Sequence, residues 1–174
     1  GIIKWPTGTG KRIAIIMCVI VLFLHYNQKK NIRIGIIANR NDIFEGVAWE
    51  EYQLLEYIGL NVHKVFKGNK LKEPLSHNES HLIITTHQWL TNGKESKEYD
   101  IKRVESLKLD VQIYDEVQNI TGPILYDYLI NNRPKHLVGI SATPYTDDEE
   151  HNNKMDKLLS REYISKCTYA RAIK

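Results

Sequence analysis

The sequence predicts an α/β fold in which helices cover both faces of a parallel sheet. Short apolar runs alternate with longer stretches of helical spacing, the pattern of strand–helix–strand units. The clearest run, residues 34–38, is almost continuously apolar, as expected for a strand buried on both faces. Polar stretches follow three of the strands, at the edge where such sheets bind ligands. A length of 174 residues with 42% hydrophobic side chains suits one domain, residues 1–174.

The strands are expected where apolar runs are bounded by polar residues. They are residues 1–3, 31–38, 61–66, 81–86, 109–114 and 136–140, with a weaker extended stretch at 161–168. The first helix, residues 11–28, is apolar almost all round, which predicts that it is buried beneath the sheet.

The remaining helices follow from apolar residues at helical spacing. They are expected at residues 43–58, 87–90, 119–130 and 148–159. Asp42 is a candidate cap for the first of these, and Gly59 is a suitable end because glycine accepts the left-handed conformation. Residues 67–80 indicate a polar loop, and residues 91–107 a charged segment that is partly helical.

The stretch at residues 5–12, Trp-Pro-Thr-Gly-Thr-Gly-Lys-Arg, lies between the first strand and the first helix. Gly8 and Gly10 allow a sharp turn that brings backbone N–H groups close to an anion. The helix points its unsatisfied N–H groups at the same place, and Lys11 can reach over the loop toward phosphate oxygens. The stretch therefore predicts a phosphate-binding loop. The alternative is a helix-capping turn with an exposed lysine.

Two adjacent carboxylates, Asp115 and Glu116, follow a strand that is otherwise mostly apolar. They suggest a Mg²⁺ ion held near Asp115 and a water polarised by Glu116. A solvated acidic strand end is the alternative. The phosphate loop upstream favours the functional interpretation, because a lysine and two carboxylates are complementary parts of one phosphoryl-transfer site. Residues 141–144, Ser-Ala-Thr-Pro, end the next strand, and on their own they indicate a simple turn.

Composition argues against several other classes of protein. The net charge of +3 is too small to indicate a polyanionic partner by itself. The longest apolar run, residues 13–24, is well short of the about 20 residues that cross a bilayer, so no membrane association is expected. Two distant cysteines and no signal-peptide pattern predict an intracellular protein, cytoplasmic or associated with a virus or nucleoid, and not a secreted one. The seven histidines lack zinc-ligand spacing, and His77 and His81 are expected to be solvated.

Three stretches taken together resemble motifs of a known family. Residues 5–12, 114–118 (Tyr-Asp-Glu-Val-Gln) and 141–144 resemble, in order and spacing, motifs I, II and III of superfamily 2 helicases. The chain looks most like the DEAD/DEAH-like type III restriction (ResIII) group, and the resemblance covers nearly all of it as the first RecA-like lobe. Residues 38–40 are similar to motif Ia, and residues 84–88 to the TTxQ stretch of the family.

The resemblance implies a role for each matching residue. Lys11, Asp115 and Glu116 would be catalytic, with Asp115 handling Mg²⁺ and Glu116 the attacking water. The residues implied in binding ATP are Thr7, Gly8, Thr9, Gly10, Lys11 and Arg12. The residues implied in coupling nucleotide state to the rest of the motor are Gln118, Ser141 and Thr143. Arg40 and Thr86 would contact a nucleic-acid backbone, with DNA favoured over RNA. A second RecA-like lobe would be the other partner.

The departures from the family pattern matter for activity. Trp5 stands in place of the first glycine of the loop, and Arg12 in place of the Ser or Thr whose hydroxyl normally binds Mg²⁺. The adenine-reading glutamine motif and the second lobe with its arginine finger are absent, so the chain is expected to be a fragment with feeble ATPase activity and no helicase activity. A nucleotide- or nucleic-acid-binding module that has lost turnover is the main alternative. A small P-loop kinase is less suitable, because residues 141–144 would then be unexplained.

Overall fold

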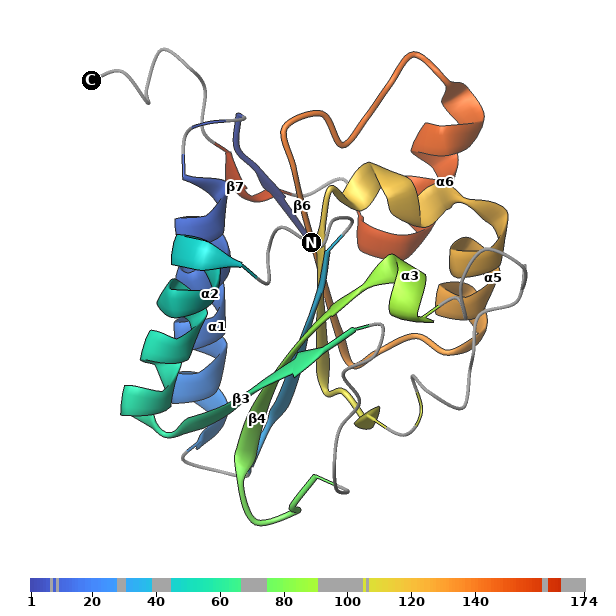
Figure 1. Cartoon of the computed structure of the whole chain (residues 1–174). Coiled ribbons are helices and arrows are strands. Elements are labelled where there is room, and N and C mark those ends of the chain that lie inside the picture. The colour runs from blue at the N-terminus through green and yellow to red at the C-terminus, as the bar shows by residue number, and fades with distance from the viewer. Residues whose placement is uncertain are drawn as a thin grey trace.

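The computed structural model describes residues 1–6, 8, 10–27, 31–38, 45–66, 75–90, 105, 107–160 and 163–166. Its centre is a seven-stranded sheet in which every paired strand is parallel to its neighbour, with the order β3-β4-β2-β5-β6-β1-β7 (Figure 1). The strands are β1 (Ile2–Lys4), β2 (Arg33–Ala38), β3 (Leu60–Val65), β4 (Ser80–Thr86), β5 (Val111–Asp115), β6 (His136–Ser141) and β7 (Tyr163–Lys166). The α/β class and the parallel sheet predicted from the sequence are confirmed.

Helices cover the sheet on two sides (Figure 1). On one side lie α1 (Lys11–Asn27), α2 (Gly46–Gln53) and its 3₁₀ continuation η2 (Leu54–Ile58). On the other side lie α3 (His87–Leu90), the 3₁₀ helix η3 (Val117–Thr121), α5 (Pro123–Asn131) and α6 (Glu149–Leu159). Each side has its own apolar cluster against the sheet.

The strands are apolar on both faces because alternate residues enter opposite clusters. On β2, Ile36 packs with α1 while Ile37 packs with the helices of the other side. On β5, Ile113 and Tyr114 divide in the same way. All four side chains are at most 1% exposed. This two-sided burial explains the nearly continuous apolar runs in the sequence.

The helix expected at residues 119–130 is two helices, and that prediction is wrong. Gly122 is extended, with φ −57° and ψ 141°, and separates η3 from α5. Pro123 is the first residue of α5, where its missing N–H costs no hydrogen bond. A proline also disfavours the helical conformation in the residue before it, so a continuous helix through Gly122 is not available.

The second expected helix begins at Gly46 and tightens into the 3₁₀ helix η2 before it ends. Gly59 ends it in the left-handed conformation with φ 96°, as predicted. Asp42, the expected cap, lies outside the described residues, as do the loop at 67–74 and most of the segment at 91–107.

The outer face of α1 is exposed, contrary to the expectation that this helix is buried. Ile13, Met17, Val21 and Leu24 recur every three or four residues and are between 53% and 60% exposed. The sheet reaches only one side of a helix, and no described segment covers the other. None of the helices in the described part of the chain is long and apolar enough to cross a membrane.

His81 also differs from the expectation of a solvated side chain. It is only 2% exposed, and its Nε2 lies 2.9 Å from the carbonyl oxygen of Ser76. Its Nδ1 lies 2.9 Å from Nε2 of His63 on the neighbouring strand β3. The ring is buried because the segment just before β4, which contains Ser76, lies against the start of the strand. His77 is exposed, as expected.

Candidate nucleotide site

A glycine turn connects β1 to α1. Gly8 and Gly10 have φ values of +79° and +88°, a region that L-residues with a side chain rarely adopt. The carbonyl of Gly10 accepts the first helical hydrogen bond, from the N–H of Ala14 (3.1 Å), so α1 starts directly at the turn. The N–H groups of the first helical turn therefore have no partner within the helix, an arrangement suited to binding an anion. Thr7 and Thr9 lie outside the described residues.

The start of this loop is fixed to the end of β6. Lys4 pairs with Ser141 in the parallel register of β1 and β6. The N–H of Trp5 donates to the carbonyl oxygen of Ser141 at 3.2 Å. The phosphate-loop candidate and the Ser-Ala-Thr-Pro stretch, far apart in the sequence, thus leave the sheet side by side.

The acidic end of β5 has a backbone conformation that is unusual for its residues. Asp115 is the last residue of the strand, and Glu116 is left-handed, with φ 53° and ψ 57°. That conformation costs an L-residue about 1–2 kcal/mol. Local hydrogen bonds offset the cost: the Glu116 N–H donates to Asp115 Oδ1 (3.0 Å), and both nitrogens of Asn119 donate to the Glu116 carbonyl (3.0 Å each).

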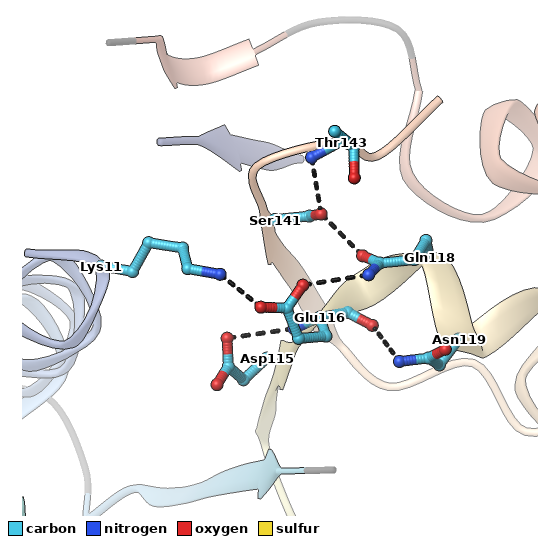
Figure 2. Close-up of polar contacts among 7 residues, drawn as sticks. All are labelled: Lys11, Asp115, Glu116, Gln118, Asn119, Ser141 and Thr143. Atoms are coloured by element: carbon cyan, nitrogen blue, oxygen red, sulfur yellow. Dashed lines mark hydrogen bonds and ion pairs between the residues drawn. The ribbon is translucent and has the colours of Figure 1, made fainter. Parts of the chain in front are cut away.

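An ion pair joins the glycine turn to this acidic end. Lys11 Nζ binds Glu116 Oε1, although β6 lies between β1 and β5 in the sheet (Figure 2). The lysine side chain is 14% exposed and the glutamate side chain 35%. The two residues that sequence reasoning assigned to one catalytic site are therefore in direct contact.

A chain of hydrogen bonds continues from the glutamate to the end of β6 (Figure 2). Gln118 Nε2 donates to Glu116 Oε2 (2.9 Å), and Ser141 Oγ donates to Gln118 Oε1 (2.6 Å). The N–H of Thr143 donates in turn to Ser141 Oγ (3.0 Å). The three residues named for coupling thus form one continuous path from Glu116, with Thr143 joining through its backbone.

Arg12 forms an ion pair with Glu51, a residue that the sequence analysis did not identify. Its guanidinium makes a two-point contact with Glu51 of α2, through Nε to Oε2 and through Nη2 to Oε1 (3.1 Å). The hydrogen bond that Arg12 donates to Glu51 is the main cause that raises the pKa of Arg12. Glu51 stands in an ordinary helix with no motif around it, so only the contact across space identifies it.

Tyr52, the next residue of α2, is a second residue that sequence reasoning missed. Its side chain is fully buried, yet its hydroxyl has no hydrogen-bond partner among the described residues. Burial raises the pKa of Tyr52, and the carboxylate of Asp115 raises it further, while Arg12 acts in the opposite direction.

Of the two candidate contacts to nucleic acid, the described residues include Thr86. Thr86 ends β4 at the same edge of the sheet as Asp115, but it is 2% exposed. Its hydroxyl accepts a hydrogen bond from the N–H of Trp89 (3.3 Å) and so caps the short helix α3. Contact between Thr86 and a phosphate stays a prediction. Arg40 lies outside the described residues.

Fold and site together define the class of this protein. A parallel sheet with a glycine turn at the head of α1, and an acid pair at the end of the central strand β5, is the arrangement of a RecA-like lobe such as those of the superfamily 2 helicases. Residues 1–146 match the family described as "Type III restriction enzyme, res subunit", and the chain belongs to that family. The family resemblance inferred from the three motifs is confirmed.

Individual relatives agree with this assignment. A protein named "Putative helicase 22", from Sulfolobus islandicus filamentous virus (isolate Iceland/Hveragerdi), is 23% identical over 151 residues, covering 85% of this chain and 25% of that protein. The Hef helicase domain of Pyrococcus furiosus has the same fold, with a TM-score of 0.64 and 15% identity over 99% of this chain and 36% of that one. The SWI2/SNF2 ATPase core of Sulfolobus solfataricus, solved with double-stranded DNA, has the same fold with a TM-score of 0.57. It is 15% identical over 92% of this chain and 31% of that one. The chain spans about a quarter of the viral relative's length.

Proposed function

We propose that this chain binds and hydrolyses ATP as the first lobe of a nucleic-acid helicase or translocase. The observation that carries the proposal is the ion pair between Lys11 and Glu116. The pair places two complementary groups together next to the glycine turn. The lysine is a cation suited to binding β- and γ-phosphates, and the glutamate is a carboxylate suited to polarising a water nucleophile. The proposal also rests on membership of the type III restriction enzyme family.

The residues at this point divide the chemistry between them. The N–H groups at the head of α1 would bind phosphate oxygens, and Lys11 would exchange the Glu116 carboxylate for the γ-phosphate. Glu116 would then be available to polarise the attacking water while Gln118 keeps its other oxygen in place. The resulting change at Glu116 would pass through Gln118 to Ser141, which is how nucleotide state would reach the end of β6.

The donor set suits Mg²⁺. No three His, Cys, Asp or Glu side chains among the described residues are placed to hold a metal ion by themselves. Mg²⁺ in phosphoryl-transfer sites commonly uses one or two carboxylates together with phosphate oxygens and water, and Asp115 would supply that carboxylate. When bound, the ion would neutralise the charge on the transferring phosphate.

Nucleic acid and a second RecA-like lobe are the proposed partners. The viral relative carries a helicase name, and the SWI2/SNF2 core was solved on double-stranded DNA, which supports nucleic acid, with DNA favoured over RNA. The chain covers 36% and 31% of the two structural neighbours. An arginine supplied by a second lobe accelerates phosphoryl transfer by about 10³–10⁵ in related NTPases. This lobe alone is therefore expected to be a feeble ATPase. We also propose an intracellular location, since the viral relative carries the name of a helicase.

A second candidate function is nucleotide binding without significant turnover. Arg12 occupies the position of the usual Mg²⁺-binding hydroxyl, and Glu51 holds it by two contacts. A site with a poorly held metal ion would bind ATP and hydrolyse it slowly.

The test is ATP hydrolysis by the intact protein with and without DNA or RNA. Glu116→Gln keeps the size of the side chain but removes the carboxylate, and we expect ATP binding to persist while hydrolysis falls by about 10²–10⁴. Glu79→Gln is the matched control, because Glu79 is exposed just before β4, at the opposite edge of the sheet. Hydrolysis unchanged in Glu116→Gln would refute the role of Glu116. ATP binding by the wild type with no hydrolysis under any nucleic acid would favour the second candidate.

A further inference from the structure

A second set of hydrogen bonds joins η3 to the Ser-Ala-Thr-Pro stretch, and its centre is His151 in the first turn of α6. The Nε2 atom of this histidine lies 3.0 Å from the carbonyl oxygen of Pro144, and its Nδ1 lies 2.9 Å from Oγ1 of Thr121. Thr121 is the last residue of η3, and Pro144 is the last residue of the Ser-Ala-Thr-Pro stretch. One side chain of α6 therefore contacts the same two segments that Gln118 and Ser141 connect.

The two ring nitrogens of His151 have different roles. A carbonyl oxygen only accepts hydrogen bonds, so Nε2 carries the proton that points to Pro144. In the neutral ring Nδ1 then accepts from the hydroxyl of Thr121, which has a single proton to give. The carbonyl oxygen of Gln118, 3.1 Å from the same hydroxyl, competes for that proton. A shift of Gln118 therefore changes the bond between Thr121 and the ring.

The first turn of α6 is tied to the loop before it, which fixes the place of the ring. Asp148 caps the helix, because its Oδ1 accepts from the N–H groups of Glu150 (2.9 Å) and His151 (3.3 Å). Asn152 bonds the main chain of Thr146 in both directions, with its Oδ1 3.0 Å from the nitrogen and its Nδ2 2.7 Å from the oxygen. A change in the hydrogen bonds of the ring would therefore act on α6 and on this loop together.

We propose that His151 is a positioning residue that ties α6 to η3 and to the end of the Ser-Ala-Thr-Pro stretch, and so passes nucleotide state on to α6. This role rests on the proposed function, in which ATP draws Lys11 away from Glu116. Gln118 donates to Glu116 Oε2 (2.9 Å), so a change at the glutamate shifts the start of η3. Thr121, at the end of the same short helix, then changes its bond to the ring.

The first test is NMR of the histidine ring nitrogens in the intact protein, with and without ATP and Mg²⁺. The signals of His151 are those that His151→Gln removes. We expect them to show a proton on Nε2 without ATP, and to shift when ATP binds because the bond to Thr121 changes. His25, exposed in the last turn of α1, is the internal control and should keep its signals. His151 signals that stay unchanged at saturating ATP would overturn the role of His151.

The second test compares ATP binding with the stimulation of hydrolysis by DNA or RNA in the intact protein. We expect His151→Ala to keep the affinity for ATP and to lower the stimulation about two- to tenfold, the effect of losing one hydrogen bond. His151→Gln keeps an amide N–H that can reach the Pro144 carbonyl oxygen, and it should recover part of the stimulation. Asn153→Ala, an exposed change in the same helix, is the matched control and should leave both quantities unchanged.

This pattern is not expected of a residue that only supports the fold. Such a residue would lower ATP affinity and stimulation together, and glutamine would rescue neither. Stimulation equal to the wild type in His151→Ala, or an equal loss of ATP affinity, would overturn the role of His151.

A double-mutant cycle tests the bond itself. Thr121→Val removes the hydroxyl and keeps the shape of the side chain. Its effect on stimulation and that of His151→Ala should be less than additive, because both changes break the same contact. Strict additivity would overturn the role of His151 while leaving the proposed function intact. A wild-type protein that binds no ATP would overturn the proposed function, and the role of His151 with it.

Discussion

Replacing Gly139 with alanine tests whether the packing behind the acidic strand end is as tight as the structure indicates. Gly139 lies in β6, opposite Tyr114 of β5 and Ile2 of β1. A Cβ built there would come within 2.4 Å of Val117 Cγ2 and 2.9 Å of Val117 Cβ. Ordinary contacts begin near 3.4 Å, so the methyl group of Val117 would have to move by about 1 Å. Rotation of the side chain can move Cγ2 but not Cβ, so the backbone at the start of η3 must also shift.

The expected cost follows from that geometry. Forcing one extra carbon into a closed core usually destabilises a protein by about 1–3 kcal/mol. For a chain of 174 residues this corresponds to a melting temperature lower by about 2–12 °C. Because Val117 directly follows Glu116, the same shift should also weaken ATP binding. Urea and thermal unfolding measure the first effect, and calorimetry the second.

Gly122→Ala is the control for Gly139→Ala. A Cβ at Gly122 would meet the Asn119 carbonyl at 3.6 Å, an ordinary contact, and its φ of −57° suits alanine. This change should be neutral or stabilising by up to about 1 kcal/mol, because alanine restricts the unfolded chain. Adding Val117→Ala to Gly139→Ala should recover part of the lost stability. A Gly139→Ala variant within about 0.5 kcal/mol of the wild type would refute the argument, since that is the range of surface substitutions.

Two further predictions concern groups buried near the site. Burial lowers the pKa of His87 to about 4, so at pH 5 the unfolded chain binds a proton there that the folded chain does not. Stability from this residue is complete above about pH 6.5 and is lost as the pH falls toward 4. It should amount to about 2 kcal/mol between pH 7 and pH 5, an effect that His87→Gln removes in urea unfolding at the two pH values. Ser141→Ala leaves the Gln118 carbonyl oxygen without its buried donor and should cost about 1–3 kcal/mol. In the intact protein it should keep ATP binding but reduce the stimulation of hydrolysis by nucleic acid, and equal stimulation would contradict the coupling path.

The parts of the molecule that sequence reasoning predicted are those in which one residue type is required locally. Gly8, Gly10 and Gly59 indicate left-handed backbone, and all three have it. Asp115 and Glu116 stood out because carboxylates end an apolar strand. The contact between Lys11 and Glu116 followed from the rule that ligands gather at the carboxyl ends of parallel strands.

What was missed depends on contacts between distant segments. Glu51 occupies an unremarkable helix, and its contact with Arg12 arises only because α2 lies against the start of α1. The break at Gly122 was overlooked because apolar periodicity outweighed the Pro123 signal. The exposed face of α1 could not be distinguished from a buried one, since apolar residues on all sides of a helix do not show which side meets the sheet.

The position of β1 determines when the site can be completed during synthesis. Among the described strands it comes first in the sequence, yet it is flanked in the sheet by β6 and β7, which come last (Figure 1). Strands β2, β3, β4 and β5 can pair among themselves soon after they leave the ribosome, while β1 has to wait for partners made more than a hundred residues later. A nascent chain that stops before β6 would hold its glycine turn unanchored, and the pocket for phosphate would be the final part of the lobe to form.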